Sequence, residues 1–567
     1  MKNIQIQQRP FLTRPENFQG MLPFMANIFA RRGIASEQDL QLKLQHLLPP
    51  HLKGLDQAVE LINQAIDQQQ KIVIVGDYDA DGATSTALMI LALRDMGADV
   101  DYLVPDRFKY GYGLTPPIAD LVQERFQPAL LITVDNGISS HAGVAQAQQY
   151  GMKVIVTDHH LTTKDAPDAD AIVNPNQLGC DFPSKALAGV GVAFYVLARL
   201  SSLRRGEGKA SSHLPQYLDL VALGTYADVA ALDYNNRILI DAGVKRIQQQ
   251  QARKGILALL EVSGREVAEF KAQDFGFVLG PRLNAAGRME TMEIGIECLL
   301  AEDYATAHAI AQQLQQLNLE RRQVEAEIKQ DALQTLEQIQ LDENELPAAL
   351  VLHEPHWHQG VIGIVAGRLK EQFHRPSIVF AADEDGIHLK GSARSIDGIH
   401  IRDAIEHVAQ QHPHLVRYFG GHAAAAGLTI EKQHFSEFKH CLTQYIQHMD
   451  AELFQMTLWT DGELPVEAFQ LTTVDLIEQH GPWGQKFPAP VFEGWFTVGD
   501  YRWLKEKHLK LNLLLENGQS VDAIAFNAAD QFDFNSMIDK VHLVYELDRN
   551  IFNGTTRLQL RVVHLKQ

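Results

Sequence analysis

Residues 71–82 read Lys71-Ile72-Val73-Ile74-Val75-Gly76-Asp77-Tyr78-Asp79-Ala80-Asp81-Gly82. The apolar run at the start is rich in β-branched residues, which is typical of a strand buried in a parallel sheet. Three carboxylates follow at alternate positions, just beyond the carboxyl end of that strand. Ligands of open α/β sheets bind at this edge, and clustered carboxylate oxygens hold hard divalent cations. The stretch therefore predicts an α/β fold and a metal-dependent enzyme.

The length and composition predict a large protein with several cores. The chain has 567 residues, of which 46% are hydrophobic, and at roughly 150 residues per domain this corresponds to about three or four domains. The first residues lack the apolar segment of a signal peptide, and the longest uncharged apolar stretch, 186–198, is too short to span a bilayer. We therefore expect a soluble, cytoplasmic protein with no membrane partner.

Cysteine content and net charge exclude several classes of protein. The three cysteines, Cys180, Cys298 and Cys441, are far apart, which argues against a disulfide framework and a thiolate zinc site. A formal net charge of -20 argues against a protein that coats nucleic acid through a basic surface. It does not exclude a nucleic-acid enzyme, because acidic metal centres add negative charge and a local arginine-lined groove can still attract a strand.

Strands and helices alternate between residues 71 and 175, which is the pattern of a parallel α/β sheet. The expected strands are 72–75, 100–104, 130–134 and 154–156, and the expected helices are 83–96, 117–126 and 139–150. A helical segment follows at 186–200, and the polar stretch 201–212 is expected to be an exposed loop. Residues 303–339 contain almost no Gly or Pro, which predicts one long helix or two stacked ones.

A second, smaller α/β unit begins with expected strands at 348–352 and 377–380 around a helix at 360–373. From residue 458 the pattern changes to short alternating strands, such as 510–515 and 557–563, which predict a terminal β-barrel. The predicted domains are a parallel-sheet domain (1–250), a helical connector (251–340), a smaller α/β domain (341–450) and a β-barrel (455–567).

The acidic run alone has two other interpretations, an EF-hand loop and a solvated acidic turn. An EF-hand needs a bidentate Glu where this chain has Leu88, and it needs an incoming helix where this chain has a strand. The solvated acidic turn is disfavoured because two later strands also end in polar residues, Asp135-Asn136-Gly137 and Asp158-His159-His160. A lone His pair is more often a surface feature than a ligand set, but its place after a Val-Ile-Val strand favours a metal ligand.

The motifs in order resemble those of a known family. The chain resembles the DHH phosphoesterase superfamily at four motifs: Asp77-Tyr78-Asp79-Ala80-Asp81-Gly82, Asp135-Asn136-Gly137, Asp158-His159-His160 and Gly224-Thr225-Tyr226-Ala227-Asp228. Its RecJ family of bacterial single-strand-specific DNA exonucleases is similar at four more: Gly280-Pro281-Arg282-Leu283-Asn284-Ala285-Ala286-Gly287-Arg288, Trp357-His358-Gln359-Gly360-Val361-Ile362-Gly363, Gly391-Ser392-Ala393-Arg394-Ser395 and Gly420-Gly421-His422-Ala423-Ala424-Ala425-Ala426-Gly427. The resemblance covers nearly the whole chain and implies a DHH domain, a DHHA1 domain and a C-terminal OB-fold.

The residue types also fit phosphodiester hydrolysis by their own chemistry. Two divalent ions a few ångströms apart can activate water and stabilise the attacking and leaving oxygens of an in-line displacement, for which bridging carboxylates are needed. The expected ligands are Asp79, Asp81, Asp135, His159 and Asp228, with Asp135 as a bridge and Asp77 as a ligand or close neighbour. The mixture of imidazole and carboxylate favours Mn2+, with Mg2+ as the alternative. We expect Asp158 to orient a ligand and His160 to face the scissile phosphate.

Residues of the later motifs are candidates for binding phosphate, because a guanidinium matches phosphate oxygens bidentately. The candidates are Arg282, Asn284, Arg288, His358, Ser392, Arg394 and His422. Each arginine has the alternative role of capping carbonyls or pairing with an acid. The glycine pair before His422 is expected to be a tight turn into a helix start, which would seat a phosphate. The resemblance implies that Ser392 and Arg394 recognise a 5′ end, and hence digestion from 5′ to 3′.

The terminal β unit has the composition of an OB-fold with aromatic and basic side chains. The aromatics available to stack on bases are Trp459, Trp483, Trp495, Tyr501 and Trp503, and the basic residues among them are Arg502, Lys505, Lys507 and Lys510. Aromatics in small barrels are usually core residues, so we expect about two of these to stack on bases.

Together these expectations describe a metal-dependent exonuclease that hydrolyses single-stranded DNA from the 5′ end to mononucleotides. A narrow passage between the two α/β domains is expected to exclude duplex. The resemblance implies a monomer that works in DNA recombination and repair beside a helicase and a single-strand-binding protein. One rival is a DHH phosphodiesterase for oligoribonucleotides, cyclic dinucleotides or polyphosphate, which would lack the connector and the β-barrel. Another is a noncatalytic replication scaffold, which would have lost the metal ligands that this chain keeps.

Overall fold

The computed structural model describes residues 4–161, 165–343, 346–530, 539–552 and 554–566. These residues form two compact units. The larger consists of Gln7–Gly287, Thr291–Gln313 and Trp459–Gln567, and the smaller of Met1–Ile6, Arg288–Glu290 and Leu314–Leu458. The domain ends predicted at residues 250, 340 and 450 stay a prediction, because the two units are built from interleaved segments.

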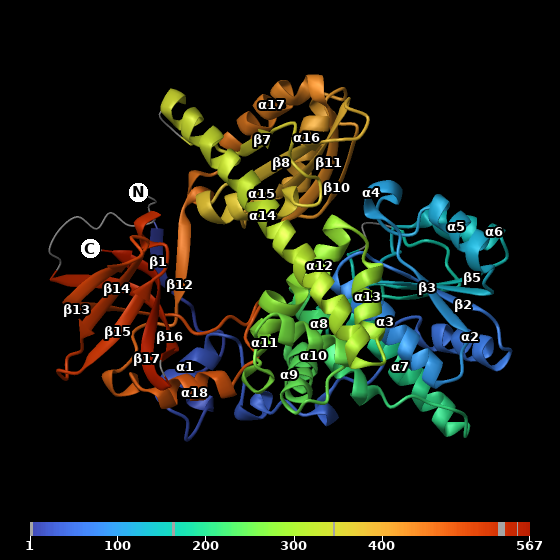
Figure 1. The fold of residues 1–567 in the computed structure, drawn as a ribbon, viewed down its shortest axis with the longest axis horizontal. Coiled ribbons are helices and arrows are strands. Elements are labelled where there is room, and N and C mark those ends of the chain that lie inside the picture. The colour runs from blue at the N-terminus through green and yellow to red at the C-terminus, as the bar shows by residue number, and fades with distance from the viewer. Residues whose placement is uncertain (1–3, 162–164, 344–345, 531–538, 553, 567) are drawn as a thin grey trace. The chain divides into compact units, whose positions relative to one another are not determined.

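A five-stranded parallel sheet organises the N-terminal half of the larger unit (Figure 1). Its spatial order is β3-β2-β4-β5-β6. The strands are β2 (Ile72–Gly76), β3 (Val100–Leu103), β4 (Leu130–Val134), β5 (Lys153–Thr157) and β6 (Ala171–Val173). All of β2 and β4 is buried, as expected where helices cover both faces. The predicted parallel sheet is confirmed, with short β6 as an additional edge strand.

Helices pack on both faces of this sheet because successive strand residues point to opposite sides. Val73 and Val75 point toward α5 (Pro116–Phe126) and α6 (His141–Gln149). The opposite face is covered by α3 (Ala80–Asp95) and α7 (Gly189–Gly206) (Figure 1). The other helices of the larger unit are α1 (Pro23–Ala30), α2 (Leu55–Asp67), α4 (Arg107–Tyr110), α8 (Leu218–Ala227), α9 (Tyr234–Gln248), α10 (Lys254–Val262), α11 (Ala272–Asp274) and α13 (Glu293–Leu300), with α12 (Gly280–Met289) ending in the smaller unit.

The prediction of an exposed loop at 201–212 is wrong for its first half, because α7 continues to Gly206 with Ser201 and Arg204 buried. Arg204 Nη1 donates to Asn63 Oδ1 at 2.6 Å and to Asp67 Oδ1 at 3.0 Å. Ser201 Oγ donates to the Ser212 carbonyl at 2.6 Å. These partners satisfy the buried polar groups of Arg204 and Ser201. Asn63 and Asp67 are distant in sequence, and Ser212 is the last residue of the stretch.

The smaller unit is a mixed sheet with two helices on each face. Its order is β10-β11-β9-β8-β7, and the strands are β7 (Leu350–His353), β8 (Ser377–Ala382), β9 (His388–Arg394), β10 (Tyr418–Gly421) and β11 (Ala425–Glu431). The stretch predicted as one long helix or two stacked ones is a single helix, α14 (Tyr304–Glu343), which packs with α15 (Ile362–Phe373) on one face. The other face carries α16 (Ile401–Gln411) and α17 (Phe435–Gln447). Neither α14 nor any other described helix combines the length and apolar character needed to cross a membrane.

The prediction that Gly420 and Gly421 lead into a helix is wrong. They end β10, and the alanines that follow enter β11, so the segment is a β-hairpin with Gly421 paired to Ala426. The turn is closed by the His422 N–H, which donates to the Ala425 carbonyl at 2.8 Å. Gly421 has a φ of 138°, and a Cβ there would lie 2.4 Å from that carbonyl oxygen, so the glycine is required by the hairpin.

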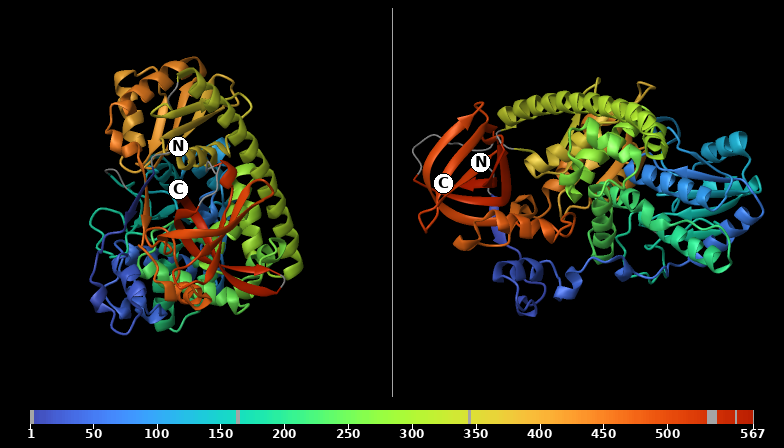
Figure 2. Two further views of the ribbon diagram at one scale, coloured as in Figure 1. Left: turned by 90° about the vertical axis from the view of Figure 1, so that its left-hand side faces the viewer. Right: turned by 60° about the horizontal axis from the view of Figure 1, so that its bottom comes forward.

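The C-terminal region forms a closed barrel in the order β13-β14-β15-β17-β16, drawn in red in Figure 2. Its strands are β13 (Phe492–Leu504), β14 (His508–Leu514), β15 (Ser520–Ala525), β16 (Lys540–Phe552) and β17 (Thr555–Lys566), preceded by β12 (Met456–Thr460), which pairs with β1 (Ile4–Gln8), and by α18 (Leu471–Gln479). The predicted barrel is confirmed. Trp495 is the most exposed of the five aromatics at 58%, whereas Trp483 stacks on Phe487 with ring centroids 5.0 Å apart.

A buried ion pair joins the N-terminal segment of the larger unit to the start of its C-terminal region. Arg32 Nη1 and Nη2 donate to the two carboxylate oxygens of Asp461 at 2.7 and 3.0 Å. The exposed fractions of the two side chains are 1% and 0%. Arg32 also donates to the carbonyls of Ile28 and Pro488, so each nitrogen of its guanidinium has an acceptor.

We predict that Asp461→Ala lowers the free energy of unfolding by about 3–5 kcal/mol, because it leaves the Arg32 charge buried without its counterion. Urea denaturation of the full chain measures this change. Asp56→Ala is the control, since Asp56 pairs with Arg199 while 81% exposed, and its loss should cost less than about 1 kcal/mol. Equal effects of the two substitutions would contradict the prediction.

Candidate metal centre

The strand register brings three acids to one level at the carboxyl edge of the parallel sheet. Gly76, Val134 and Thr157 stand side by side, and each is the last residue of its strand. The edge lies at a reversal of chain order, since β3 and β4 flank β2 on opposite sides. Ligands of doubly wound sheets bind at such a switch point. The residues that follow the three strand ends are Asp77, Asp135 and Asp158.

Asp135 occupies a strained turn after β4. Its φ is 61°, in the left-handed region, which costs a non-glycine residue on the order of 1–3 kcal/mol. The surroundings impose it, because Asn136 Nδ2 donates to the carbonyls of Val75 and Val134 at 3.1 and 2.9 Å. The turn therefore aims one carboxylate at the sheet edge, and Asn136 serves to hold it there.

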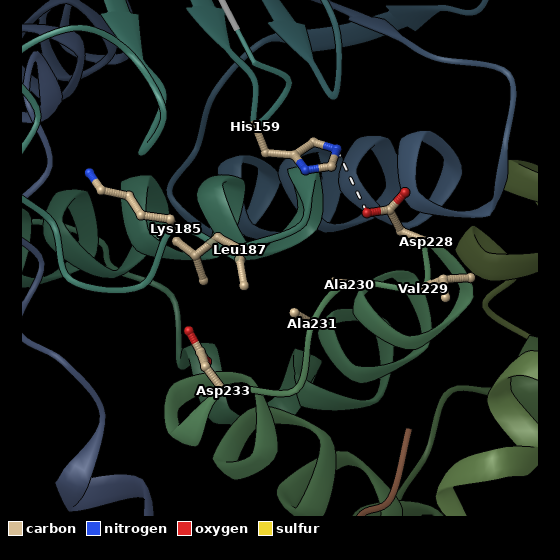
Figure 3. A pocket seen from close by; sticks show the side chains of 9 residues that line it. His159, Lys185, Leu187, Asp228, Val229, Ala230, Ala231 and Asp233 are labelled. Atoms are coloured by element: carbon tan, nitrogen blue, oxygen red, sulfur yellow. Dashed lines mark ion pairs between the residues drawn. The ribbon is translucent and has the colours of Figure 1, made fainter. Parts of the chain in front are cut away.

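Carboxylates and imidazoles from four chain segments converge at this edge. His159 Nε2 lies 3.1 Å from Asp135 Oδ1, 3.8 Å from Asp228 Oδ2 and 4.0 Å from Asp81 Oδ2. Figure 3 shows His159 and Asp228 pointing toward one another at one side of a cavity of about 520 Å³, which Lys185 and Asp233 also line. Ligand atoms approach within 4.8 Å in three overlapping sets, namely Asp77 with Asp79 and Asp135, Asp81 with His159 and Asp228, and Asp135 with His159 and His160.

Two atoms at the centre of this cluster fit a cation. Asp135 Oδ1 and His159 Nε2 are buried, and neither has a hydrogen-bond partner among the described residues. Burial and then the neighbouring carboxylates raise the pKa of Asp81 to about 7 and the pKa values of Asp135 and Asp228 well above their usual range. Buried acceptors that face one another are stable only with a proton or a cation between them. The donor set therefore fits divalent metal ions.

The two adjacent histidines have opposite protonation. Burial, with the nearby charge of His160, lowers the pKa of His159 to about 4, so its ring is neutral and can ligate a metal. Burial also disfavours the charged form of His160, but the hydrogen bond and charge of Asp158 raise the pKa of His160 to about 9. His160 is therefore cationic at neutral pH.

Asp158 is fully engaged in holding this loop. Its Oδ1 accepts from the His159 and His160 backbone N–H groups at 2.7 and 3.0 Å and from His160 Nδ1 at 2.7 Å. Its Oδ2 accepts from the Ile138 N–H at 2.9 Å. Asp158 therefore positions the two imidazoles, as expected for the outer partner of a metal ligand.

The first turn of α7 holds Asp81, and sequence reasoning missed this contact. Asp81 Oδ2 accepts from the Gly189 N–H at 2.6 Å and Oδ1 from the Val190 N–H at 2.9 Å. A Cβ at Gly189 would lie 2.6 Å from both Cβ and Oδ1 of Asp135. Gly189 is thus the point where the helix closes on the acids. Nothing local marks it, because an apolar segment with glycines is typical of any buried helix.

The opposite boundary of the site includes Tyr112, which sequence reasoning also missed. Its hydroxyl lies 3.3 Å from either ring nitrogen of His160 and 3.4 Å from the Asp135 carbonyl oxygen. Its ring meets His160 edge-on, with centroids 5.8 Å apart. The loop that carries Tyr112 has no motif, so only the folded chain brings the phenol to the site.

Two phosphate-binding candidates lie in the larger unit and already serve the fold. Asn284 Oδ1 accepts the Ala80 N–H at 2.8 Å, which anchors the acidic turn before α3. That helix begins at Ala80, earlier than the predicted residue 83, because Asp79 caps it by accepting from the Asp81 and Gly82 N–H groups. Arg282 Nη1 donates to the Val278 carbonyl at 2.6 Å.

The remaining candidates lie in the smaller unit. Arg394 Nη1 donates to Ser392 Oγ at 3.1 Å, and both side chains border the first turn of α15, where a Cβ on Gly363 would lie 2.9 Å from Ser392 Oγ. Arg288 Nη1 donates to the Gly360 carbonyl at 3.1 Å, and His358 Nδ1 accepts the Gly360 N–H at 3.1 Å. His422 sits in the β10–β11 hairpin, where the carbonyl of the next residue, Ala423, accepts the N–H of Ile401, the first residue of α16.

We predict that Gly189→Ala weakens Mn2+ binding about 10- to 100-fold, the usual cost of disturbing the partners of metal ligands, because the new methyl group displaces Asp135. Isothermal titration of the full chain with Mn2+ measures this. Gly206→Ala is the matched control, since Gly206 ends the same helix and a Cβ there meets nothing within 4 Å. Unchanged Mn2+ affinity in Gly189→Ala would show that the contact is dispensable.

Comparison with known proteins places the chain in a family. Three family models match it: the DHH family N-terminal domain at residues 71–225, the DHHA1 domain at 346–448 and the RecJ OB domain at 460–564. The single-stranded-DNA-specific exonuclease RecJ of Haemophilus influenzae is 48% identical over 96% of each chain, and that of Escherichia coli is 44% identical over 95% of each. RecJ of Thermus thermophilus in complex with Mn2+ superposes with a TM-score of 0.83 at 30% identity, over 100% of this chain and 79% of that one. The chain belongs to the RecJ family of DHH proteins.

Proposed function

We propose that this chain hydrolyses single-stranded DNA as a divalent-metal-dependent exonuclease. One observation carries the proposal. Asp135 Oδ1 and His159 Nε2 are buried among carboxylates, and neither atom has a hydrogen-bond partner among the described residues. Membership of the RecJ family supports the substrate, because the relatives in Haemophilus influenzae and Escherichia coli are named single-stranded-DNA-specific exonucleases.

Two groups of side chains would each hold one ion. One group is Asp77, Asp79 and Asp135, and the other is Asp81, His159 and Asp228. Asp135 is proposed as the residue shared by the two groups, because its Oδ1 lies 3.1 Å from His159 Nε2 of the second group. Divalent ions bound here supply a nucleophile from water and neutralise charge on the reacting phosphate. The mixed ligands favour Mn2+ and then Mg2+, and RecJ of Thermus thermophilus has been crystallised in complex with each.

His160 is proposed to donate a hydrogen bond to the scissile phosphate. Asp158 Oδ1 accepts from His160 Nδ1 at 2.7 Å and fixes the ring, which leaves Nε2 as the donor toward substrate. Tyr112 borders the same ring and limits the directions from which a phosphate can approach it. These residues position the phosphate, while the carboxylates remain for the metal ions.

Ser392, Arg394 and the first turn of α15 are proposed to bind a 5′-terminal phosphate. The N-terminus of this 12-residue helix attracts anions, and Arg394 adds a charged donor beside it. Recognition of this end sets digestion from 5′ to 3′ and releases mononucleotides. Contacts to the rest of the DNA backbone are proposed for Arg282, Asn284, Arg288, His358 and His422.

The barrel is proposed to stack on bases through Trp495, Tyr501 and Trp503, which are 58%, 40% and 37% exposed. Trp483 is unsuited to this role, because its ring packs on Phe487 and its Nε1 donates to the Ile477 carbonyl at 2.9 Å. We further propose a cytoplasmic monomer that acts in DNA recombination and repair beside a helicase and a single-strand-binding protein.

Two rival functions are less well supported. A DHH phosphodiesterase for small substrates needs no terminal barrel, yet the RecJ OB domain matches residues 460–564. A noncatalytic scaffold needs no metal ligands, yet the acids and His159 converge within bonding distance of a shared cation. Both features favour an exonuclease that holds a polymeric strand.

We predict that Asp135→Asn lowers nuclease activity at least about a hundredfold, because metal ligation contributes several kcal/mol to transition-state stabilisation. The assay uses single- and double-stranded oligonucleotides labelled at either end, with Mn2+, Mg2+ or a chelator. Loss of the 5′ label as mononucleotide, from single strands only, is the expected pattern. Asp168→Asn, a change at an exposed acid, is the control. Activity that survives chelation or the Asp135→Asn substitution would contradict the proposed function.

We predict that Arg394→Ala reduces the preference for a 5′-phosphorylated over a 5′-hydroxyl strand about 10-fold or more, the worth of one charge-assisted hydrogen bond. Comparison of kcat/KM for the two strands measures the preference, and Mn2+ titration should show unaltered metal binding. Arg402→Ala is the control, because Arg402 lies on α16 on the opposite face of the sheet. An unchanged preference would remove Arg394 from the terminal pocket.

A further inference from the structure

A second cluster of metal-ligating side chains lies in the smaller unit. It consists of His414, His434 and Glu437, whose ligand atoms all lie within 4.8 Å of one another. None of the three belongs to the motifs of the DHH centre, and the cluster forms within one compact unit. Two imidazoles and one carboxylate are the ligands of many three-residue transition-metal sites.

Core residues fix the backbone on which each ligand stands. His414 lies in the loop after α16 and precedes Leu415, which is fully buried. His434 is the residue before α17, and Glu437 is one turn further on the same face of that helix. Phe438, the residue after Glu437, is also fully buried in the core against α16. Packing of these neighbours therefore fixes the backbone positions of the three ligands before any ion binds, which favours a preorganised site.

His414 and Glu437 are hydrogen-bonded to one another, at a spacing that also suits a shared ion. His414 Nε2 lies 3.3 Å from Glu437 Oε1, whereas the paired His356 and Asp331 of the same unit are 2.8 Å apart. Donors bound to a tetrahedral ion at about 2.0–2.1 Å are separated by about 3.3 Å. His434 Nε2 lies 3.7 Å from Glu431 Oε2, and among the described residues no other acid forms an ion pair with His434.

We propose that His414, His434 and Glu437 bind one divalent transition-metal ion, with Zn2+ preferred. Imidazole ligands favour Zn2+, Co2+ and Ni2+ over Mg2+ and Mn2+, so the site differs in selectivity from the carboxylate-rich DHH centre. The side chains are 52%, 24% and 50% exposed, which leaves the fourth position open to water. The bound ion ties the loop after α16 to the first turn of α17 and stabilises the smaller unit.

The test compares the metal content of full-length variants, because the DHH centre also accepts divalent ions. Chelator-treated wild type, His434→Ala, His414→Ala and the control His448→Ala are dialysed against Zn2+ and analysed for bound zinc. His448 follows the other end of α17 and lies outside the cluster. Each cluster variant should bind about one equivalent less than wild type, and His448→Ala should match wild type. Titration with Co2+ should likewise lose one visible absorption component in the cluster variants only.

Thermal unfolding provides the second measurement and checks that the variants fold. Without metal, all four proteins should unfold at the same temperature, and Zn2+ should raise the unfolding temperature more in wild type and His448→Ala than in the cluster variants. Equal zinc content in wild type and both cluster variants would overturn the proposal. A cluster variant that unfolds earlier without metal would also count against it, because the residues would then have a structural role that needs no ion.

Discussion

The structure of the DHH centre depends on holding several carboxylates together where water solvates them poorly. Two like charges 4 Å apart at an effective dielectric constant near 20 repel by about 4 kcal/mol, and a few such pairs rival the ~5–15 kcal/mol that holds a domain together. Burial and this repulsion raise the pKa values of Asp81, Asp135 and Asp228, so protonation of these acids lowers the cost. Cations of the right size would replace those protons and restore the charges. Affinity for divalent metal is therefore a consequence of how the chain folds around these acids.

The acids stay in place because backbone groups hold them. Asp79 caps its own helix, Asp81 receives the first N–H groups of α7, and Asp158 receives three backbone N–H groups and one imidazole. Helix N-termini carry partial positive charge, so they stabilise carboxylates without adding mobile cations. Glycine makes the approach of α7 feasible, since a side chain at Gly189 would collide with Asp135. Geometry and electrostatics are thus set by the same few contacts.

The sheet and its acids could be predicted because their signals are local. Runs of β-branched residues mark β2, β4 and β5, and the register of parallel strands then places Asp77, Asp135 and Asp158 together. Gly189 and Tyr112 could not be found in this way, because their roles come from contacts distant in sequence. Long-range partners also explain two wrong predictions. Arg204 extends a helix through a polar stretch by bonding Asn63 and Asp67, and pairing with Ala426 makes Gly421 part of a hairpin.

The net charge of -20 constrains how such a protein can hold DNA. With this charge the protein cannot have a uniformly basic surface. Its binding to DNA therefore cannot depend on general neutralisation of phosphates. The proposed sources of affinity are instead discrete: metal ions at the acidic edge, a guanidinium beside a helix N-terminus, and exposed aromatic rings on the barrel. Aromatic stacking and a terminal phosphate both require a strand whose bases and end are accessible. A duplex exposes its terminal phosphates but not the faces of its paired bases, so the stacking contacts are the element that would favour single strands.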